Sequence, residues 1–151
     1  MKITSQEEYG LRCLLQLARM AEHSVVSVKE IAAKEGLSHA YVEKLLRILS
    51  RAGLAHSARG IKGGYALNRP ASAISLGEVV RALGTEQTTK HICQVFTGNQ
   101  DVCVHFNDCG LRSVWSGLTT YIKNFLDRTT LDSLLENEFT VSARLTQRLV
   151  G

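Results

Sequence analysis

Three cysteines, two histidines and two aspartates lie within the twenty residues of segment 91–110, HICQVFTGNQDVCVHFNDCG. Thiolates, imidazoles and carboxylates are the side chains that bind transition metals, and pairs of thiols also form redox-active disulfides. A chain of 151 residues is long enough to bury a core without a disulfide framework. The segment therefore predicts a metal or redox site.

The spacing of the cysteines indicates which kind of site. Nine residues separate Cys93 from Cys103, and five separate Cys103 from Cys109. A mononuclear zinc site usually contains a closer pair, so the spacing fits zinc poorly. A loop with three thiolates suits an iron-sulfur cluster, with a metal-free disulfide switch as the alternative. The fourth cysteine, Cys13, lies in an amphipathic segment and is expected to be a core residue.

Composition and hydropathy restrict the compartment. The N-terminal residues include charges where a signal peptide needs an apolar stretch, and no apolar run approaches the length of a membrane span. We therefore expect a cytoplasmic protein, without a membrane partner, in which clustered cysteines remain reduced unless they bind metal or sense redox state. No phosphate-binding glycine loop and no serine-histidine-acid pattern is recognisable, so neither an enzyme nor a small-molecule substrate is expected.

The positive charge is concentrated in one segment. Residues 28–69 contain eight Lys and Arg against three Asp and Glu, whereas the remainder contains ten against eleven. A local excess of this kind attracts phosphate, although a solvated helical face is the alternative.

Helical periodicity begins before this basic segment. Apolar residues at helical spacing predict a first helix that follows a cap at Ser5 and extends to about Met20. Ser27 is expected to cap a second helix, VKEIAAKEG, with Glu30 completing a capping box and Gly36 ending the helix.

A third helix follows over the sequence LSHAYVEKLLRILSRAG, with Ser38 as its cap. The predicted buried positions are Tyr41, Leu45, Ile48 and Leu49, and the predicted exposed positions are Ala40, Lys44, Arg47 and Arg51. Two short helices joined by Gly-Leu-Ser match a helix-turn-helix, whose second helix enters the DNA major groove.

The next segment, LAHSARGIKGGYALNRP, alternates apolar and polar residues around a glycine-rich turn. This pattern predicts a β-hairpin. Arg59 and Lys62 at its tip are suited to contact the DNA backbone or minor groove, which would make the hairpin a wing. A hairpin that only covers the core is the alternative.

The candidate DNA contacts lie on the third helix and the hairpin. Those expected to lie near base edges are Ser38, His39, Ala40, Tyr41, Glu43 and Lys44. Arg47 and Arg51 are expected on phosphates. Tyr41 has the core as its alternative place, and Glu43 is unfavourable near phosphate unless it accepts a hydrogen bond from a cytosine amino group. A winged domain that binds a protein partner is a further alternative.

A long apolar helix is predicted after the cysteines, following a short helix that Ser75 and Glu78 open with a capping box. Its apolar residues recur at threes and fours: Leu111, Val114, Trp115, Leu118, Tyr121, Ile122, Phe125 and Leu126. A small domain covers only part of such a face, so we expect a homodimer on a palindromic DNA operator. Packing of the helix against its own domain is the alternative.

Several motifs together carry a family resemblance. The N-terminal MKIT, the segment IAAKEGLSHAYVEKLLRILSRAGL, the wing string ARGIKGGYAL, ISLGEVVRAL and the three cysteines together resemble the IscR/NsrR-type winged-helix regulators, the Rrf2 family. The resemblance covers nearly the whole chain and implies a homodimeric transcription factor that senses through an iron-sulfur cluster. It places Cys93, Cys103 and Cys109 as ligands, with a two-iron or four-iron cluster left open. The first cysteine gap is longer than in the best-known members.

The resemblance leaves the fourth ligand open. IscR-like members have a histidine three residues after the last cysteine, where this chain has Arg112. NsrR-like members use a carboxylate on the first helix of the partner subunit, and Glu8 matches that position. His105 and His91 are the local alternatives. In the family, a glutamate at the position of Glu43 tunes the choice of DNA site.

The resulting prediction is a mainly α fold with a small β-hairpin wing. Its expected parts are a winged helix-turn-helix domain over 1–84, a cysteine-bearing sensor loop over 85–110, a dimerisation helix with a return segment over 111–140, and a tail over 141–151. The predicted function is transcriptional regulation, as a repressor that senses iron, redox state or nitric oxide through the cluster. A cluster-free thiol and disulfide regulator is the alternative.

Overall fold

The computed structural model describes residues 3–20, 24–60, 63–84 and 89–150, with side chains in the last range described for 92–147. Its α-helices are α1 (Ser5–Ala18), α2 (Val28–Glu35), α3 (His39–Arg51), α4 (Leu76–Leu83), α5 (Thr89–Val95), α6 (Gly110–Asp127) and α7 (Glu138–Val150). The strands are β1 (Ala55–Ala58) and β2 (Gly64–Leu67), and two 3₁₀ turns are η1 (Ala71–Ala73) and η2 (Leu131–Leu134). The predicted mainly α fold with one hairpin is confirmed.

The start of α1 differs from the prediction by one residue. Thr4, not Ser5, is the N-cap, because its hydroxyl accepts a hydrogen bond from the Glu7 amide at 3.2 Å. Glu7 Oε2 accepts in return from the Thr4 amide at 2.7 Å, which completes a capping box. The helix ends at Ala18, two residues before the predicted Met20.

The helix-turn-helix forms as predicted apart from one contact. The Ser27 hydroxyl accepts from the Glu30 amide at 3.1 Å, and Gly36 ends α2 in the left-handed region with a φ of 66°. The predicted capping box is only half formed, because the Glu30 carboxylate pairs with Lys34 at 2.9 Å. Ser38 caps α3 as predicted by accepting from the Tyr41 amide at 3.3 Å.

The buried face of α3 is displaced from the predicted stripe. Leu45 and Leu49 are buried as predicted, whereas Tyr41 and Ile48 are half-buried. The fully buried positions include Val42 and Leu46. The apolar residues of α3 span a wide arc, and packing on α1 and α4 decides which of its edges is covered.

The hairpin is also bonded to the segment before α2. Strands β1 and β2 pair antiparallel, with Ser57 opposite Tyr65. The amide of Val26 donates to the Tyr65 carbonyl at 2.9 Å, and the Tyr65 amide donates back at the same distance. A side chain on Gly64 would place its Cβ 2.2 Å from the Val26 carbonyl oxygen, so this approach requires glycine. The hairpin therefore has a fixed position relative to the helix-turn-helix.

The hydrophobic core lies among the first four helices and the hairpin. Its fully buried members include Leu14 of α1, Ile31 of α2, Leu45 of α3 and Val79 of α4. Leu131 of η2 joins this core, so the chain returns to it after α6. Cys13 is also fully buried in this cluster, which confirms its predicted core position.

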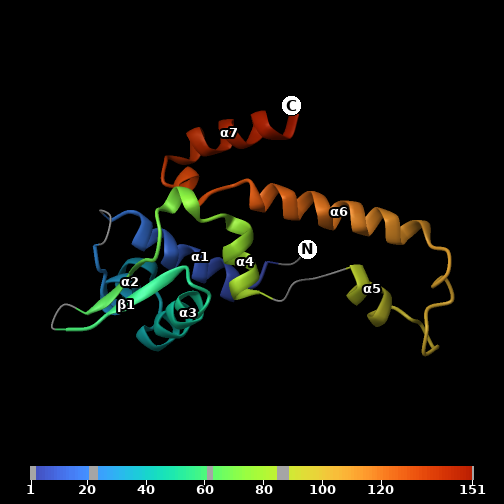
Figure 1. Ribbon diagram of the computed structural model, residues 1–151, viewed down its shortest axis with the longest axis horizontal. Coiled ribbons are helices and arrows are strands. Elements are labelled where there is room, and N and C mark those ends of the chain that lie inside the picture. The colour runs from blue at the N-terminus through green and yellow to red at the C-terminus, as the bar shows by residue number, and fades with distance from the viewer. Residues whose placement is uncertain (1–2, 21–23, 61–62, 85–88, 151) are drawn as a thin grey trace.

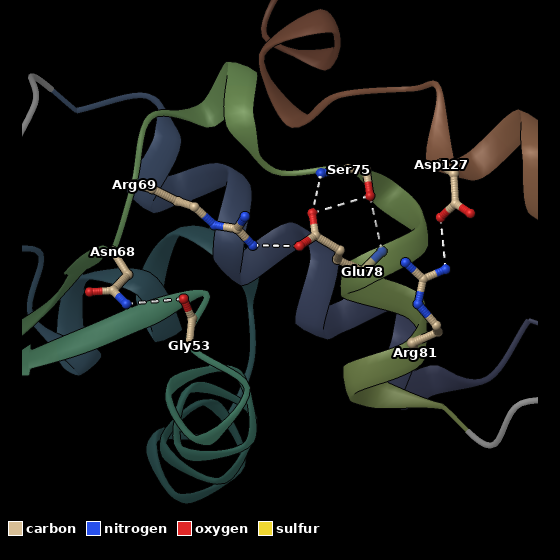
Figure 2. A network of polar contacts seen from close by, with 7 residues as sticks. All are labelled: Gly53, Asn68, Arg69, Ser75, Glu78, Arg81 and Asp127. Atoms are coloured by element: carbon tan, nitrogen blue, oxygen red, sulfur yellow. Dashed lines mark hydrogen bonds and ion pairs between the residues drawn. The ribbon is translucent and has the colours of Figure 1, made fainter.

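A polar network connects the end of the hairpin to α4 (Figure 2). Arg69 pairs with Glu78 at 2.6 Å, and Glu78 Oε2 accepts from the Ser75 amide at 2.9 Å in the predicted capping box. Asn68 donates to the Gly53 carbonyl at 3.1 Å and so holds the hairpin to the turn after α3.

Helix α6 projects from this domain, and its two ends have different neighbours (Figure 1). Its C-terminal end is joined to α4 by an ion pair between Arg81 and Asp127 (Figure 2). Its N-terminal end carries the cysteine-bearing segment away from α1–α4 (Figure 1). Cys93 lies on the short helix α5 of this segment. Helix α7 extends across residue 141, where the tail was expected to begin.

Candidate DNA-reading face and cysteine pocket

Helix α3 presents a polar and basic surface to solvent. Most of the predicted contacts on it are exposed: Ser38, His39, Ala40, Lys44, Arg47 and Arg51. Arg59 at the hairpin is also exposed, whereas Lys62 lies outside the described residues. The turn, the start of α3 and the hairpin thus form one surface with the geometry of a winged helix-turn-helix.

Glu43 lies on this surface in an ion pair. Its Oε1 is 2.7 Å from Nη2 of Arg47, one helical turn further along α3. Both side chains are substantially exposed, so the pair contributes little to stability. It does bring an acceptor and a donor together at the centre of the helix that would read DNA.

Tyr41 faces α1 as well as the surface. Its ring meets the Tyr9 ring edge to face, with centroids 6.1 Å apart, and the guanidinium of Arg12 lies 5.3 Å from the Tyr9 centroid. The half-buried Tyr41 also packs against the hydrophobic core. Tyr41 therefore lies partly in the core, which is the alternative place that the prediction gave for it.

A polar contact that the sequence analysis did not identify joins α1 to the end of α2. Nε of Arg12 lies 2.6 Å from Oε2 of Glu35, and Gln16 donates to the other carboxylate oxygen. The hydrogen bond that Arg12 donates to this carboxylate is the main cause that raises the pKa of Arg12 above its ordinary value. Glu35 immediately precedes the Gly36 turn, so α1 holds the turn of the helix-turn-helix in place. The charged residues were visible in the sequence, but their pairing over 23 positions depends on the fold.

The cysteines of the 91–110 segment line one large pocket of about 720 Å³. Cys93 comes from α5, Cys109 is the N-cap of α6, and Cys103 lies between them. All three thiols are free and half-buried, and His105 also lines the pocket. The apolar wall includes Ile92, Phe96, Leu111, Trp115, Leu118, Ile122 and Leu126.

The pocket has donors that suit an iron-sulfur cluster, although they are not gathered into a closed site. The three thiols that line it are the ligand type that such clusters prefer. Within residues 3–20, 24–60, 63–84 and 92–147, no three His, Cys, Asp or Glu side chains come close enough to hold a metal ion. Binding of a single metal ion by three of these described side chains would therefore require movement of α5 or of the 103–109 loop.

The candidates for a fourth ligand differ in position. His105 lines the pocket, and the side chain of His91 lies outside the described part of the structure. Glu8 is exposed on α1 and is absent from the pocket lining, whereas its neighbour Glu7 is present there. The carboxylate of Glu7 accepts hydrogen bonds from the Thr4 amide and hydroxyl.

Arg112 occupies the position of the IscR-type histidine and contacts the cysteine loop. Its Nη2 donates to the Phe106 carbonyl and, at 3.4 Å, to the His105 carbonyl. Its guanidinium carbon lies 5.6 Å from the centroid of the Phe106 ring. The missing histidine is visible in the sequence, whereas the contact of Arg112 with the loop is not, and the three-residue spacing from Cys109 is its only signal.

The apolar face of α6 is largely uncovered in this chain. Five large side chains have exposed fractions from 42% to 65%: Leu111, Val114, Trp115, Leu118 and Tyr121. Single exposed apolar residues are ordinary, but a continuous row along one helix indicates an interaction surface. Ile122, Phe125 and Leu126 are half-buried.

Comparison with known proteins decides the family. The family model described as "Rrf2: Iron-dependent Transcriptional regulator" matches residues 3–137. The chain belongs to the Rrf2 family. The resemblance inferred from the sequence motifs is thereby confirmed, and this Rrf2 regulator has the winged-helix architecture predicted for it.

Individual relatives agree with this assignment. IscR of Yersinia pseudotuberculosis, named an HTH-type transcriptional regulator, is 33% identical over 138 residues, which cover 91% of this chain and 81% of the relative. The solved structure of T. potens IscR has a TM-score of 0.71 and 31% identity, covering 89% of this chain and 86% of that chain. The solved structure of the oxidized form of Staphylococcus aureus CymR has a TM-score of 0.71 and 32% identity, and the match covers 91% of this chain and 98% of that chain.

This Rrf2 regulator is accordingly a DNA-binding transcriptional regulator and not an enzyme. Among the described residues, no helix has both the length and the apolar character needed to cross a membrane.

Proposed function

We propose that this chain is a cytoplasmic, homodimeric repressor whose DNA binding depends on an iron-sulfur cluster held by Cys93, Cys103 and Cys109. The single observation that carries the proposal is that all three thiols line one pocket beside α6. The family description, which names iron-dependent regulators, and the IscR relatives support a role of this pocket in binding iron.

The proposed DNA contacts lie on the exposed surface of α3 and the hairpin. Residues at the start of α3, from Ser38 to Lys44, would face base edges, and the cations Arg47, Arg51, Arg59 and Lys62 would contact phosphates. Glu43 would discriminate between sites, because its carboxylate accepts from cytosine but is unfavourable elsewhere at the DNA surface. Breaking its pair with Arg47 would accompany this contact.

The proposed dimer uses the uncovered face of α6. A second copy of the same helix would bury the row of apolar side chains from Leu111 to Tyr121 and place two reading surfaces on a palindromic operator. The Arg81 and Asp127 pair at the other end of α6 would transmit a change in helix position to α4 and the winged domain.

The proposed cluster site combines two wall elements with a ligand from elsewhere. Cys93 on α5 and the loop carrying Cys103 and Cys109 would hold the cluster. The bound cluster would be the group that responds to iron, oxygen or nitric oxide. We propose Glu8 of a second subunit as the fourth ligand, since its exposed position on α1 leaves it accessible to another chain. His105 in the same pocket, and His91, are the alternatives.

A second function, a metal-free thiol switch, has its own support. The three thiols are free and half-buried, and one similar solved structure is an oxidized form of CymR. In this alternative, two thiols of the pocket lose two electrons and two protons to an oxidant such as a peroxide and form a disulfide.

Anaerobic reconstitution tests the two functions. The cluster proposal predicts a coloured protein with stoichiometric iron and sulfide, which Cys93→Ala, Cys103→Ala or Cys109→Ala abolishes while Cys13→Ala does not. Mössbauer spectra would identify a two-iron or four-iron cluster. A colourless protein after reconstitution would overturn the cluster proposal, and a disulfide found by mass spectrometry after mild oxidation would then support the thiol switch.

Gel shifts of both forms test the coupling. Cluster-bound and metal-free protein should differ in affinity for the same operator, because regulation requires the two states to bind DNA differently. Affinity should also fall steeply with salt if the basic surface contacts phosphates. Equal affinity of the two forms would contradict regulation through the cluster.

A further inference from the structure

Arg112 has contacts that distinguish it from the other cations of the pocket. Arg112 lies in the first turn of α6, three residues after Cys109, and its side chain turns back over the 103–109 loop. Its guanidinium donates to two successive carbonyls, those of His105 and Phe106, and lies over the Phe106 ring.

These contacts close the loop that carries two of the three pocket thiols. The loop has an internal turn, in which the Phe106 amide donates to the Cys103 carbonyl at 2.9 Å. Arg112 binds the far side of the same turn, and its own amide donates to the Cys109 carbonyl at 3.2 Å. Arg112 therefore contacts the middle of the 103–109 loop with its side chain and the end of the loop with its backbone amide.

The large apolar side chains of this loop are exposed to solvent. Val104 and Phe106 have exposed fractions of 77% and 57%, so burial contributes little to its order. A guanidinium suits this task because its N–H donors form a fixed planar fork, of which Nη2 makes both bonds here. A hydrogen bond from a charged donor is also stronger than a neutral one.

We infer that Arg112 is a positioning residue that holds Cys103 and Cys109 in a preformed loop before any cluster or disulfide forms. A ligating histidine at this position would bind metal directly, whereas Arg112 has no lone pair to offer and acts through the carbonyls of His105 and Phe106. We call the contacts of Arg112 with the carbonyls of His105 and Phe106 the Arg112 clamp. Cys93 lies outside this clamp, on α5. Pocket assembly then consists of bringing one thiol on a helix to two thiols on an ordered loop. This inference rests on the proposed function only in that the thiols are taken to bind a cluster or to form a disulfide.

Amide hydrogen exchange of the full-length, reduced, metal-free protein tests the clamp. Arg112→Gln removes the charged fork and should accelerate exchange of the Phe106 amide by about tenfold, the effect expected for loss of a charge-assisted hydrogen bond. Arg112→Lys retains the charge without the planar fork and should give an intermediate rate. Lys123→Gln removes another cation of the pocket lining and is the matched control, with no expected change.

A second measurement separates positioning from general stability. Exchange of α3 amides should be unchanged in Arg112→Gln, because Arg112 lies outside the hydrophobic core. After reconstitution, the same variant should lose iron to a chelator faster than the wild type. An unchanged Phe106 exchange rate in Arg112→Gln, or an equal acceleration in Lys123→Gln, would overturn the inference. A wild-type protein that binds no iron would contradict the cluster proposal and leave the loop measurement valid.

Discussion

Nη1 of Arg81 lies 2.7 Å from Oδ1 of Asp127, so the last turn of α4 is joined to the last residue of α6. This ion pair is favoured by a close approach at Gly77, where an added Cβ would fall 1.9 Å from the same carboxylate oxygen. The winged domain and the projecting helix therefore meet at a joint that needs a glycine, an arginine and an aspartate together.

Breaking the Arg81–Asp127 pair should affect the coupling between the cysteine pocket and DNA binding more than the stability of the fold. Asp127→Asn removes a pair whose side chains are about one-third exposed, so the free energy of unfolding should fall by about 1 kcal/mol or less. If α6 transmits the state of the cysteine pocket, the same variant should reduce the difference in DNA affinity between cluster-bound and metal-free protein. Thermal unfolding and paired gel shifts measure the two effects. A double-mutant cycle with Arg81→Gln that gives no coupling energy would show that the pair contributes nothing.

The hairpin should depend on the glycine that touches the segment before α2. Gly64→Ala introduces a Cβ next to the Val26 backbone, which cannot move without breaking its two hydrogen bonds to Tyr65. The expected cost is about 1–3 kcal/mol of stability, together with weaker DNA binding because the wing is displaced. Gly117→Ala on α6 meets open space and is a suitable control in thermal unfolding. Unchanged melting and operator affinity in Gly64→Ala would contradict this description of the hairpin.

Local sequence signals predicted the elements of this fold well. Ser27, Ser38 and Gly36 begin or end helices as expected, because capping depends on residues only a few positions apart. The same locality explains the one-residue difference at α1, where Ser5 with Glu8 offers the same spacing as Thr4 with Glu7.

Contacts between distant residues were not predictable in this way. The pairing of Arg12 with Glu35 and of Arg81 with Asp127 depends on how helices pack, and each residue has several possible partners in the sequence. The cysteine segment was expected to be a loop, but Cys93 lies on α5. This helix was not predicted, because seven residues give too short a periodic pattern to recognise. The shared pocket of the three thiols likewise became visible only in the folded chain.

Acid should weaken the connection between the hairpin and α4 through Glu78. Hydrogen bonding from the Ser75 backbone, followed by that from Arg69, holds the pKa of Glu78 below its ordinary value of 4.5. A carboxylate with a lowered pKa in the folded state contributes stability that is fully present above the unfolded value. That contribution is lost as pH falls from about 4.5 through the folded pKa. Glu78→Gln should therefore flatten the decrease in melting temperature over this range, and an unchanged pH profile would contradict the assignment.

Cys13 should behave differently from the three pocket cysteines toward an alkylating reagent. Burial raises the pKa of its thiol to about 11, and the thiolate is the nucleophile. In reduced protein at pH 8, iodoacetamide should modify Cys93, Cys103 and Cys109, which are half-buried, and leave Cys13 intact until the chain unfolds. Mass spectrometry of peptides after increasing exposure times measures this order. Because the folded pKa is raised, the thiol's contribution to stability is present below about pH 9 and is lost as pH rises toward 11. Cys13→Ala should remove that alkaline loss, and early modification of Cys13 in the native protein would contradict its place in the core.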